Sequence, residues 1–417
     1  MLQLRTHPVR WATVGMKNNR LLYLVIALTL VLTSCNLPGR TPTPSASPSP
    51  SATNTPITPS PTETIQPSPS PLPTHTPVTS RTPSPTLPVY SAPNTPLPSS
   101  LNEITYLNAG LVSRLAEWRV EDVSDLAWST DSRMLAVAGY DQITVYDIQT
   151  RNQAAYIPTR GGITSISFSP RGNYLVAGYS FGDDETGLAG GIDYWRTSDW
   201  QRVGALYDNE QPVAQIDFSP KGDTFAAALT GPIYEQNEVL FWDTFTWEIT
   251  PTLRTSGALA IDFSPDSLQF ATSPDRYALK IWDVEKVKEI QLLYQIHTTF
   301  TGAISSMAYA PNSAILATGT YEGEIGLWDA AKGALIRILQ NGGVVESVSF
   351  SRDSSVLASG ESFTDSAIRL WDVETGLILN TLRGFSNGVQ KIAFAPNGQI
   401  LASASYDGTI ILWGIRP

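Results

Sequence analysis

The side chains that most often carry enzyme chemistry are scarce in this chain of 417 residues. It has a single cysteine, Cys35, and three histidines, His7, His75 and His297. Zinc sites, Cys–His pairs and Ser–His–Asp triads each need several such residues close together in the fold. We therefore predict that the protein is not an enzyme and that it holds no metal ion and no other cofactor.

Acidic segments are the remaining candidates for a metal site. Segments 180–191 and 229–238 contain five acidic residues, namely Asp183, Asp184, Glu185, Glu235 and Glu238. Their spacing is not that of an EF-hand or a similar calcium loop. We expect solvated acidic loops, which would favour a basic partner.

Cys35 has a role that the residues before it indicate. Four basic residues precede the apolar run 21–32, which is shorter than the roughly 20 residues that a helix needs to cross a bilayer. Such an arrangement is typical of a secretory signal, here residues 1–35. The sequence LTSC at 32–35 resembles the bacterial lipobox, which implies cleavage before Cys35 and lipidation of its thiol. We expect a lipid-anchored protein of the cell envelope, outside the cytoplasm; the alternative is an uncleaved N-terminal anchor.

Composition divides the remaining chain at about residue 100. Residues 36–100 contain 19 of the 31 prolines and 25 Ser and Thr residues, which predicts a disordered linker because so little apolar surface is available to bury. Residues 101–417 contain 21 basic and 37 acidic residues. A domain this acidic repels phosphate backbones, so nucleic acid is not an expected partner.

Residues 101–417 repeat one pattern seven times. An apolar strand ends in an aromatic residue and a Ser-Pro type turn, as in ISFSPRG at 166–172. A strand of small residues follows, as in LASG at 357–360, and then a third strand such as LWD at 370–372. The third-strand aromatic residues recur about every 44 residues, the length of one propeller blade. This pattern predicts an all-β fold, a seven-bladed β-propeller of four-stranded antiparallel blades.

These repeats resemble those of the WD-repeat family over residues 109–413. The Gly-His pair that usually opens a WD repeat is missing, so the family's buried His–Asp hydrogen-bond network is not expected. Trp200 and Trp247 follow third strands on the lower face, where each is either exposed or covers its turn. Six tryptophans at one repeat position are predicted to pack between neighbouring sheets: Trp195, Trp242, Trp282, Trp328, Trp371 and Trp413.

The last repeat has only three strands before the chain ends. The segment AGLVSRL at 109–115 parallels TGLILNTL at 375–382. We therefore predict that residues 109–118 supply the missing fourth strand and close the ring, which removes two open sheet edges.

The resemblance also implies where a partner binds. In the WD-repeat family the turns between second and third strands lie on the upper face, with the loops that lead into each blade. The acidic residues in these turns are expected to cap turn amides; they are Asp141, Asp275, Asp365 and Asp407, with Glu322 in place of Asp in one blade. Aromatic and arginine side chains there match the composition of interface hot spots. The predicted docking residues are Tyr140, Tyr179, Tyr406, Phe385 and Arg119.

A monomeric scaffold that binds other proteins is the function that the resemblance implies. One alternative to the docking site is that each tyrosine ring merely covers its own turn. One alternative function is a lipoprotein that helps to assemble the envelope. Another is a propeller hydrolase with carboxylates and a metal in the central channel, although no constellation of acids or histidines is evident at channel positions.

Overall fold

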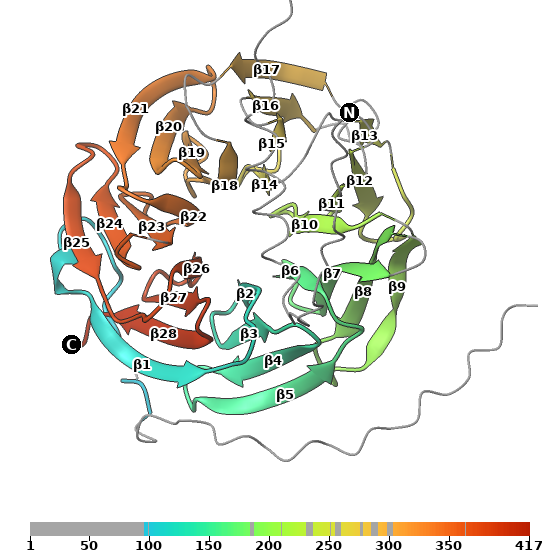
Figure 1. Ribbon diagram of the computed structural model, residues 1–417, viewed down its shortest axis with the longest axis horizontal. Coiled ribbons are helices and arrows are strands. Elements are labelled where there is room, and N and C mark those ends of the chain that lie inside the picture. The colour runs from blue at the N-terminus through green and yellow to red at the C-terminus, as the bar shows by residue number, and fades with distance from the viewer. Residues whose placement is uncertain are drawn as a thin grey trace, which may run out of the picture. The chain divides into compact units, whose positions relative to one another are not determined.

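The computed structural model describes residues 96–98, 100–183, 187–209, 211–230, 237–250, 252–254, 260–275, 278–284, 291–297, 303–362 and 364–417. Within these ranges the chain forms seven four-stranded antiparallel sheets, set like blades around a central channel (Figure 1). The fold is the predicted seven-bladed propeller. The signal segment, Cys35 and the linker up to residue 95 lie outside the described residues. Leu97, which falls in the predicted linker, is buried against the core.

The two inner strands of each blade follow the predicted repeat. The second strands consist largely of small apolar residues, because sheets on both sides cover them. The inner strands are β2 (Asp125–Trp128), β6 (Ile163–Phe168), β10 (Val213–Phe218), β14 (Ile261–Phe263), β18 (Ile304–Tyr309), β22 (Val344–Phe350) and β26 (Val389–Phe394). The second strands are β3 (Met134–Ala138), β7 (Tyr174–Asp183), β11 (Thr224–Leu229), β15 (Gln269–Asp275), β19 (Ile315–Thr320), β23 (Val356–Ser362) and β27 (Ile400–Ser405).

The third and fourth strands complete each blade toward the outside. The third strands are β4 (Gln142–Asp147), β8 (Gly187–Arg196), β12 (Glu238–Asp243), β16 (Ala278–Asp283), β20 (Glu324–Asp329), β24 (Ile368–Asp372) and β28 (Thr409–Gly414). The fourth strands are β5 (Asn152–Pro158), β9 (Arg202–Asn209), β13 (Leu253–Arg254), β17 (Gln291–His297), β21 (Ala334–Gln340), β25 (Ile378–Leu382) and β1 (Ser113–Arg119). His297 therefore ends strand β17.

Strand β1 closes the ring, as predicted. It pairs with β28 from Ser113 opposite Gly414 to Arg119 opposite Thr409, so blade 7 contains both ends of the folded region. Inner strand β26 of this blade contacts β2 of blade 1. The strand nevertheless begins later than predicted, because 109–111 form a short 3-10 helix, η1 (Ala109–Leu111). The Asn380 side chain holds this segment beside β25 by donating to the carbonyl oxygens of Ala109 and Val112.

The six repeat tryptophans lie in the core, which confirms their predicted role. All are buried between neighbouring sheets. Four of them donate their indole N–H to a hydroxyl on the second strand of the same blade, so the buried nitrogen is satisfied. These pairs are Trp282–Thr272, Trp328–Thr318, Trp371–Ser359 and Trp413–Ser403, at 2.7 to 3.0 Å.

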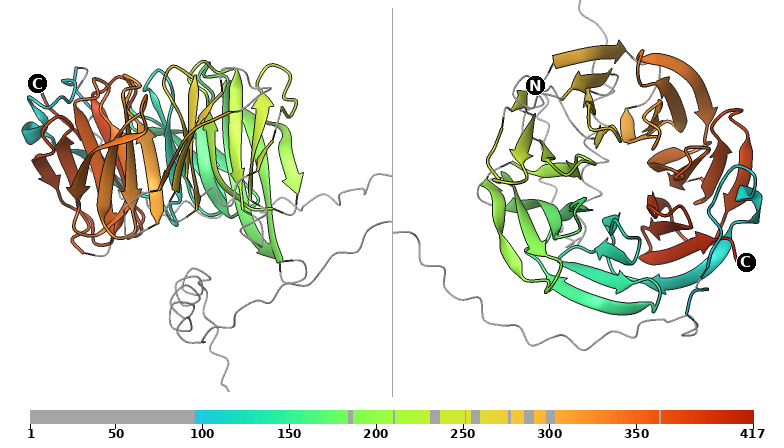
Figure 2. Two further views of the ribbon diagram at one scale, coloured as in Figure 1. Left: turned by 90° about the horizontal axis from the view of Figure 1, so that it is seen from above. Right: turned by 180° about the vertical axis from the view of Figure 1, so that it is seen from behind.

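Blade 2 differs from the prediction at its second turn. The segment 180–191, expected to be a loop, continues the ladder of β7 and β8, with Ser180 opposite Gly190 and Asp183 opposite Gly187. Figure 2 shows this hairpin projecting beyond the rim of the ring. Of the acidic residues expected in loops, Asp183 lies in β7 and Glu238 begins β12. Asp184, Glu185 and Glu235 lie outside the described residues.

Candidate functional site

The upper face is formed by the turns between second and third strands and by the loops that lead into each inner strand. Tyr140 and Tyr406 occupy two of these turns and are 60% and 40% exposed. Each ring leans on a glycine of a neighbouring loop, since a Cβ at Gly161 or Gly388 would lie 3.4 Å from it. One side of each ring therefore covers a loop, while the other side is open to solvent.

Arg119 lies between these two tyrosine turns. It is exposed at the end of β1, and the next residue, Val120, donates its N–H to the carbonyl oxygen of Gly408 at 2.8 Å. Toward Tyr140, the backbone at Gly139 packs against Glu121. A Cβ added at Gly139 would lie 3.1 Å from the carbonyl oxygen of Glu121. The backbone contacts of their neighbours thus place Tyr406, Arg119 and Tyr140 side by side along the upper face. We name these three residues the tyrosine arc.

Two of the predicted docking residues, Tyr179 and Phe385, are not exposed on this surface as expected. Tyr179 is fully buried in the core between blades 1 and 2, because it lies one residue before the exposed turn position that Tyr140 and Tyr406 occupy in their blades. Burial raises the pKa of its hydroxyl, and the guanidinium of Arg160 lies 5.6 Å from the ring centre. Its prediction as an exposed anchor was wrong. Phe385 is half-buried and packs edge-on against Trp413, with ring centres 6.2 Å apart.

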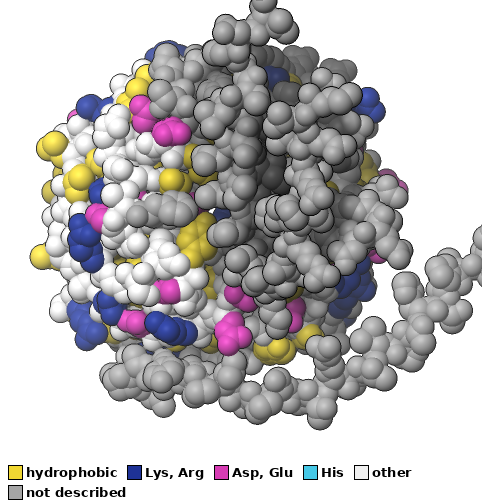
Figure 3. Space-filling model, in the orientation of Figure 1, with side chains coloured by type: hydrophobic (Ala, Val, Ile, Leu, Met, Phe, Trp, Pro, Cys, Tyr) yellow, Lys and Arg dark blue, Asp and Glu magenta, His cyan; other side chains and the backbone are white. Residues whose placement is uncertain are grey.

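Acidic side chains surround the tyrosine arc. Glu121, Asp122 and Asp141 are all exposed beside Arg119 and Tyr140. On the face seen in Figure 3, acidic and basic side chains are interspersed across the coloured part of the surface. Any preference of the arc for a basic partner must therefore come from these local carboxylates rather than from a broad charged field.

The turn acids behave in two different ways. Asp407 accepts the backbone N–H groups of Thr409 and Ser386, at 2.9 and 3.0 Å. Burial alone would raise the pKa of Asp407, but these hydrogen bonds and the Ser386 hydroxyl lower it to about 2. Asp407 caps its turn as expected. Asp365 instead pairs with the guanidinium groups of Arg369 and Arg383, at 3.0 and 2.9 Å.

The central channel holds carboxylates that the sequence analysis did not place there. Asp125, Asp217, Asp262 and Glu346 line a cavity of about 570 Å³ together with Lys391. The signal was present in the alternation of the inner strands: residues one and three positions before the inner-strand aromatic residue face the channel. The repeated IDF of 216–218 and 261–263 therefore directs two aspartates inward.

Most of these polar groups join one blade to the next. An oxygen on one inner strand accepts a backbone N–H from the inner strand of the following blade, so neighbouring sheets are held together at the channel wall. The pairs are Asp125–Ile166, Gln215–Ile261, Asp217–Phe263, Asp262–Tyr309, Ser347–Ile392 and Ser349–Phe394, at 2.6 to 3.2 Å. Lys391 also reaches Asp125 across the junction of blades 7 and 1, at 3.3 Å.

Asp217 and Asp262 lie on neighbouring inner strands, β10 and β14, and the pKa of each depends on the other carboxyl group. Desolvation at the channel wall raises the pKa of Asp217 to about 7. It also raises the pKa of Asp262, and the neighbouring charge of Asp217 adds to that shift. Such a pair keeps a bound proton at pH values at which an isolated aspartate has already lost its proton.

Neither a metal site nor a membrane span is present in the part of the chain that the structure describes. No three His, Cys, Asp or Glu side chains there are grouped so that they could hold a metal ion. Among the same residues, no helix has the length and apolar character needed to cross a bilayer.

Comparison with known proteins supports the interpretation of the repeats. The WD domain, G-beta repeat family matches residues 291–329, 333–372 and 376–414, and each match begins with the fourth strand of one blade and continues through three strands of the next. The family of eukaryotic translation initiation factor eIF2A matches residues 108–240, which span β1 to β12.

Three similar proteins come from plants and cattle. Periodic tryptophan protein 2 of Arabidopsis thaliana is 29% identical over 61% of this chain and 27% of its own length. Cell division cycle 20.1, cofactor of APC complex, from the same plant is 23% identical over 70% and 63%. Transducin beta-like protein 3 of Bos taurus is 28% identical over 38% and 19%. The chain thus spans less than two thirds of each relative. The matched segments and the four-stranded blades that they span show that residues 291–414 contain WD repeats.

Proposed function

We propose that this protein is a non-catalytic scaffold that binds another protein through the tyrosine arc. The observation that carries the proposal is the position of Tyr140 and Tyr406, which are exposed on neighbouring blades on either side of Arg119. Tyrosine and arginine are the residues most enriched in interface hot spots. The partner presents a basic segment, because Glu121, Asp122 and Asp141 surround the arc.

The channel supports a structural role for its carboxylates rather than a catalytic one. Asp125, Asp217 and Asp262 each use an oxygen to accept an N–H from the next blade. We therefore assign these groups to holding the blades together.

We also propose that the protein is a lipoprotein held at a membrane outside the cytoplasm. The support is the sequence LTSC at 32–35 after a basic segment and a short apolar run. Mass spectrometry of the mature N-terminus tests this proposal: the expected chain begins at a lipidated Cys35, and Cys35→Ser prevents the modification. A soluble mature chain that begins at any other residue would contradict it.

Binding by the arc is tested by capture of the partner from an extract of the cells that make the protein. The double variant Tyr140→Ala and Tyr406→Ala is compared with the unchanged chain by quantitative mass spectrometry. Tyr156→Ala is the matched control, because this tyrosine is 56% exposed on the fourth strand of blade 1, away from the arc. We expect the double variant to lose at least about tenfold in affinity, as for truncated hot-spot anchors, and the control to lose nothing. Equal capture by all three proteins would contradict the proposal.

A further inference from the structure

One position in the lower turns requires a left-handed backbone. It lies four residues after the end of the third strand, and glycine occupies it in blades 5 and 6, as Gly333 and Gly376, with φ of 64° and 76°. Blades 1, 2 and 3 place Arg151, Trp200 and Trp247 there, each with φ of 58°. A side chain in this conformation costs about 1–2 kcal/mol relative to a relaxed backbone. Something therefore offsets that cost at the two tryptophans.

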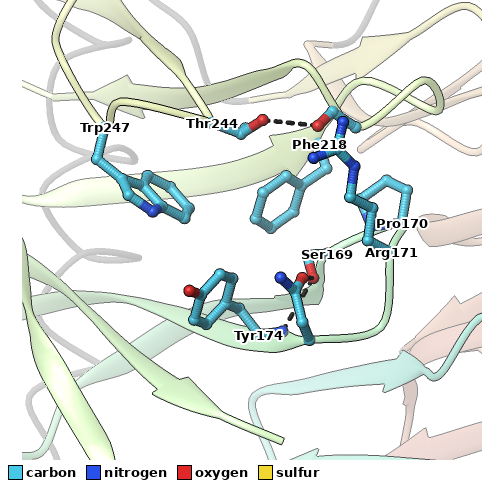
Figure 4. Close-up of a pocket in the computed structure, with 9 residues that line it drawn as sticks. Ser169, Pro170, Arg171, Tyr174, Phe218, Thr244 and Trp247 are labelled. Atoms are coloured by element: carbon cyan, nitrogen blue, oxygen red, sulfur yellow. Dashed lines mark hydrogen bonds between the residues drawn. The ribbon is translucent and has the colours of Figure 1, made fainter.

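Packing accounts for part of the offset at Trp247. Its ring centre lies 5.2 to 6.4 Å from those of Tyr174, Tyr194, Phe218 and Phe225, so it joins blades 2 and 3. The ring is nevertheless only half-buried. Beside it lies a cavity of about 20 Å³, room for one water-sized group, with the rings of Trp247, Tyr174 and Phe218 around it (Figure 4).

An exposed cation and an exposed aromatic ring lie at the mouth of this cavity. The Arg171 guanidinium stacks over Phe245, 4.1 Å from the ring centre, and Phe245 is 64% exposed. Lys221 is exposed on the adjacent turn of blade 3. The two turns touch, because a Cβ on Gly222 would lie 3.3 Å from the Cβ of Pro170. Arg171 and Lys221 thus belong to one surface.

The nearby carboxylates do not neutralise these cations. Asp243 accepts the N–H groups of Phe245 and Thr246, at 2.8 and 3.1 Å. Asp223 accepts the hydroxyl of Ser219 at 2.8 Å. Among the residues that the structure describes, neither Arg171 nor Lys221 has a carboxylate within ion-pair distance. The positive charge of both side chains is therefore available to a ligand.

We propose that this lower-face patch binds an acidic segment of a partner protein. The patch, which we name the Trp247 surface, consists of Arg171, Tyr174, Lys221, Phe245 and Trp247. Carboxylates of the segment pair with Arg171 and Lys221, and an apolar side chain between them packs on Phe245 and Trp247. The occupant is an acidic peptide, because the two cations flank the rings of Phe245 and Trp247, which suit an apolar side chain set between carboxylates. This site is separate from the tyrosine arc.

A pair of fluorescent peptides tests the proposal on the full-length chain. One peptide alternates Glu and Leu, and the other alternates Lys and Leu. Fluorescence anisotropy should show binding of the acidic peptide, weakened at least about tenfold by the double variant Arg171→Glu and Lys221→Glu, which should in turn bind the basic peptide. Arg352→Glu is the matched control, since it makes the same change on an exposed arginine of a lower turn in blade 6.

Four results would overturn the proposal. The first is no binding of the acidic peptide, and the second is equal binding by the double variant and the unchanged chain. The third is loss of the peptide on Tyr140→Ala with Tyr406→Ala, which would move the site to the tyrosine arc. The fourth is self-association of the chain that the double variant abolishes and the peptide does not displace, because the occupant would then be a second copy. The circular dichroism spectrum of each variant is compared with that of the unchanged chain. An unchanged spectrum shows that the variant is folded, so its loss of binding reports on the site.

Discussion

The upper and lower faces of this propeller present aromatic side chains in opposite ways. On the upper face, Tyr140 rests on Gly161 in an ordinary turn and has exposed carboxylates around it. On the lower face, Trp247 occupies a left-handed position that blades 5 and 6 give to glycine, and exposed cations lie beside it. The two surfaces thus suit partners of opposite charge. A repeated scaffold can vary its turns in this way because most contacts between blades are made by the strands.

Both surfaces depend on the closed ring, so opening it should have the largest effect. Deletion of residues 109–118 removes most of β1, including the buried Leu115 and Trp118. We expect the free energy of unfolding to fall by about 5 kcal/mol or more, because two large apolar side chains are lost and β28 gains an open edge. Thermal denaturation followed by circular dichroism measures this. A deleted chain that melts like the full one would show that β1 does not close the ring.

The second prediction concerns the backbone strain of the lower face. Trp247→Gly loses four ring contacts but relaxes the left-handed backbone, so we expect a net loss of about 2 kcal/mol. Trp200→Gly makes the same change where the ring packs edge-on against Phe168, and should cost about 1 kcal/mol. Urea denaturation compares the two variants. A larger loss for Trp200→Gly would mean that packing does not distinguish the two turns.

The propeller architecture could be predicted from sequence because the pattern that defines a blade is local. Alternating apolar residues, a Ser-Pro turn and a regularly spaced aromatic residue each report on neighbours within one sheet. Ring closure by β1 was likewise predictable, since strand β25 has a similar sequence. The exact start of β1 was not, because Asn380, more than 260 residues away, holds η1 out of the strand.

The candidate site was harder to predict, because facing and burial depend on neighbouring blades. Tyr179 lies one residue earlier in its repeat than Tyr140 does, at the buried position that Gly139 occupies in blade 1. Asp217 and Asp262 were not predicted as site residues, although the alternation of their strands directs them into the channel. For Trp247 the sequence allowed either an exposed ring or a ring that covers its turn. The structure shows a half-buried ring, so each alternative holds in part.

The third and smallest predicted effect is on the pH dependence of stability. It comes from the channel wall, which both faces share. The pKa of Asp217 in the folded state is about 7, above its ordinary value of 3.8. The folded state therefore binds more protons than the unfolded state between these values, so stability falls as pH rises through this range. Asp217→Asn keeps an oxygen for the N–H of Phe263 without the charge. We expect it to be more stable than the unchanged chain at pH 7, by on the order of 1 kcal/mol, and to lose that advantage as the pH falls toward 4.

A hydroxyl at an equivalent blade junction supplies the control. Ser349 accepts the N–H of Phe394 in the same way but does not titrate. Ser349→Ala should therefore lose about 1 kcal/mol at both pH values. Urea denaturation at the two pH values distinguishes the variants, and a pH-independent effect of Asp217→Asn would contradict the assigned proton.

Binding at the tyrosine arc is tested most directly by photocrosslinking in the cells that make the protein. A photoreactive benzophenone side chain replaces Tyr140 in one full-length variant and Tyr156 in another, so equally exposed tyrosines on the upper face and on the outer wall of blade 1 are compared. We predict a discrete crosslinked protein from position 140 and none from position 156. The same crosslink from both positions, or from position 156 alone, would contradict binding at the arc.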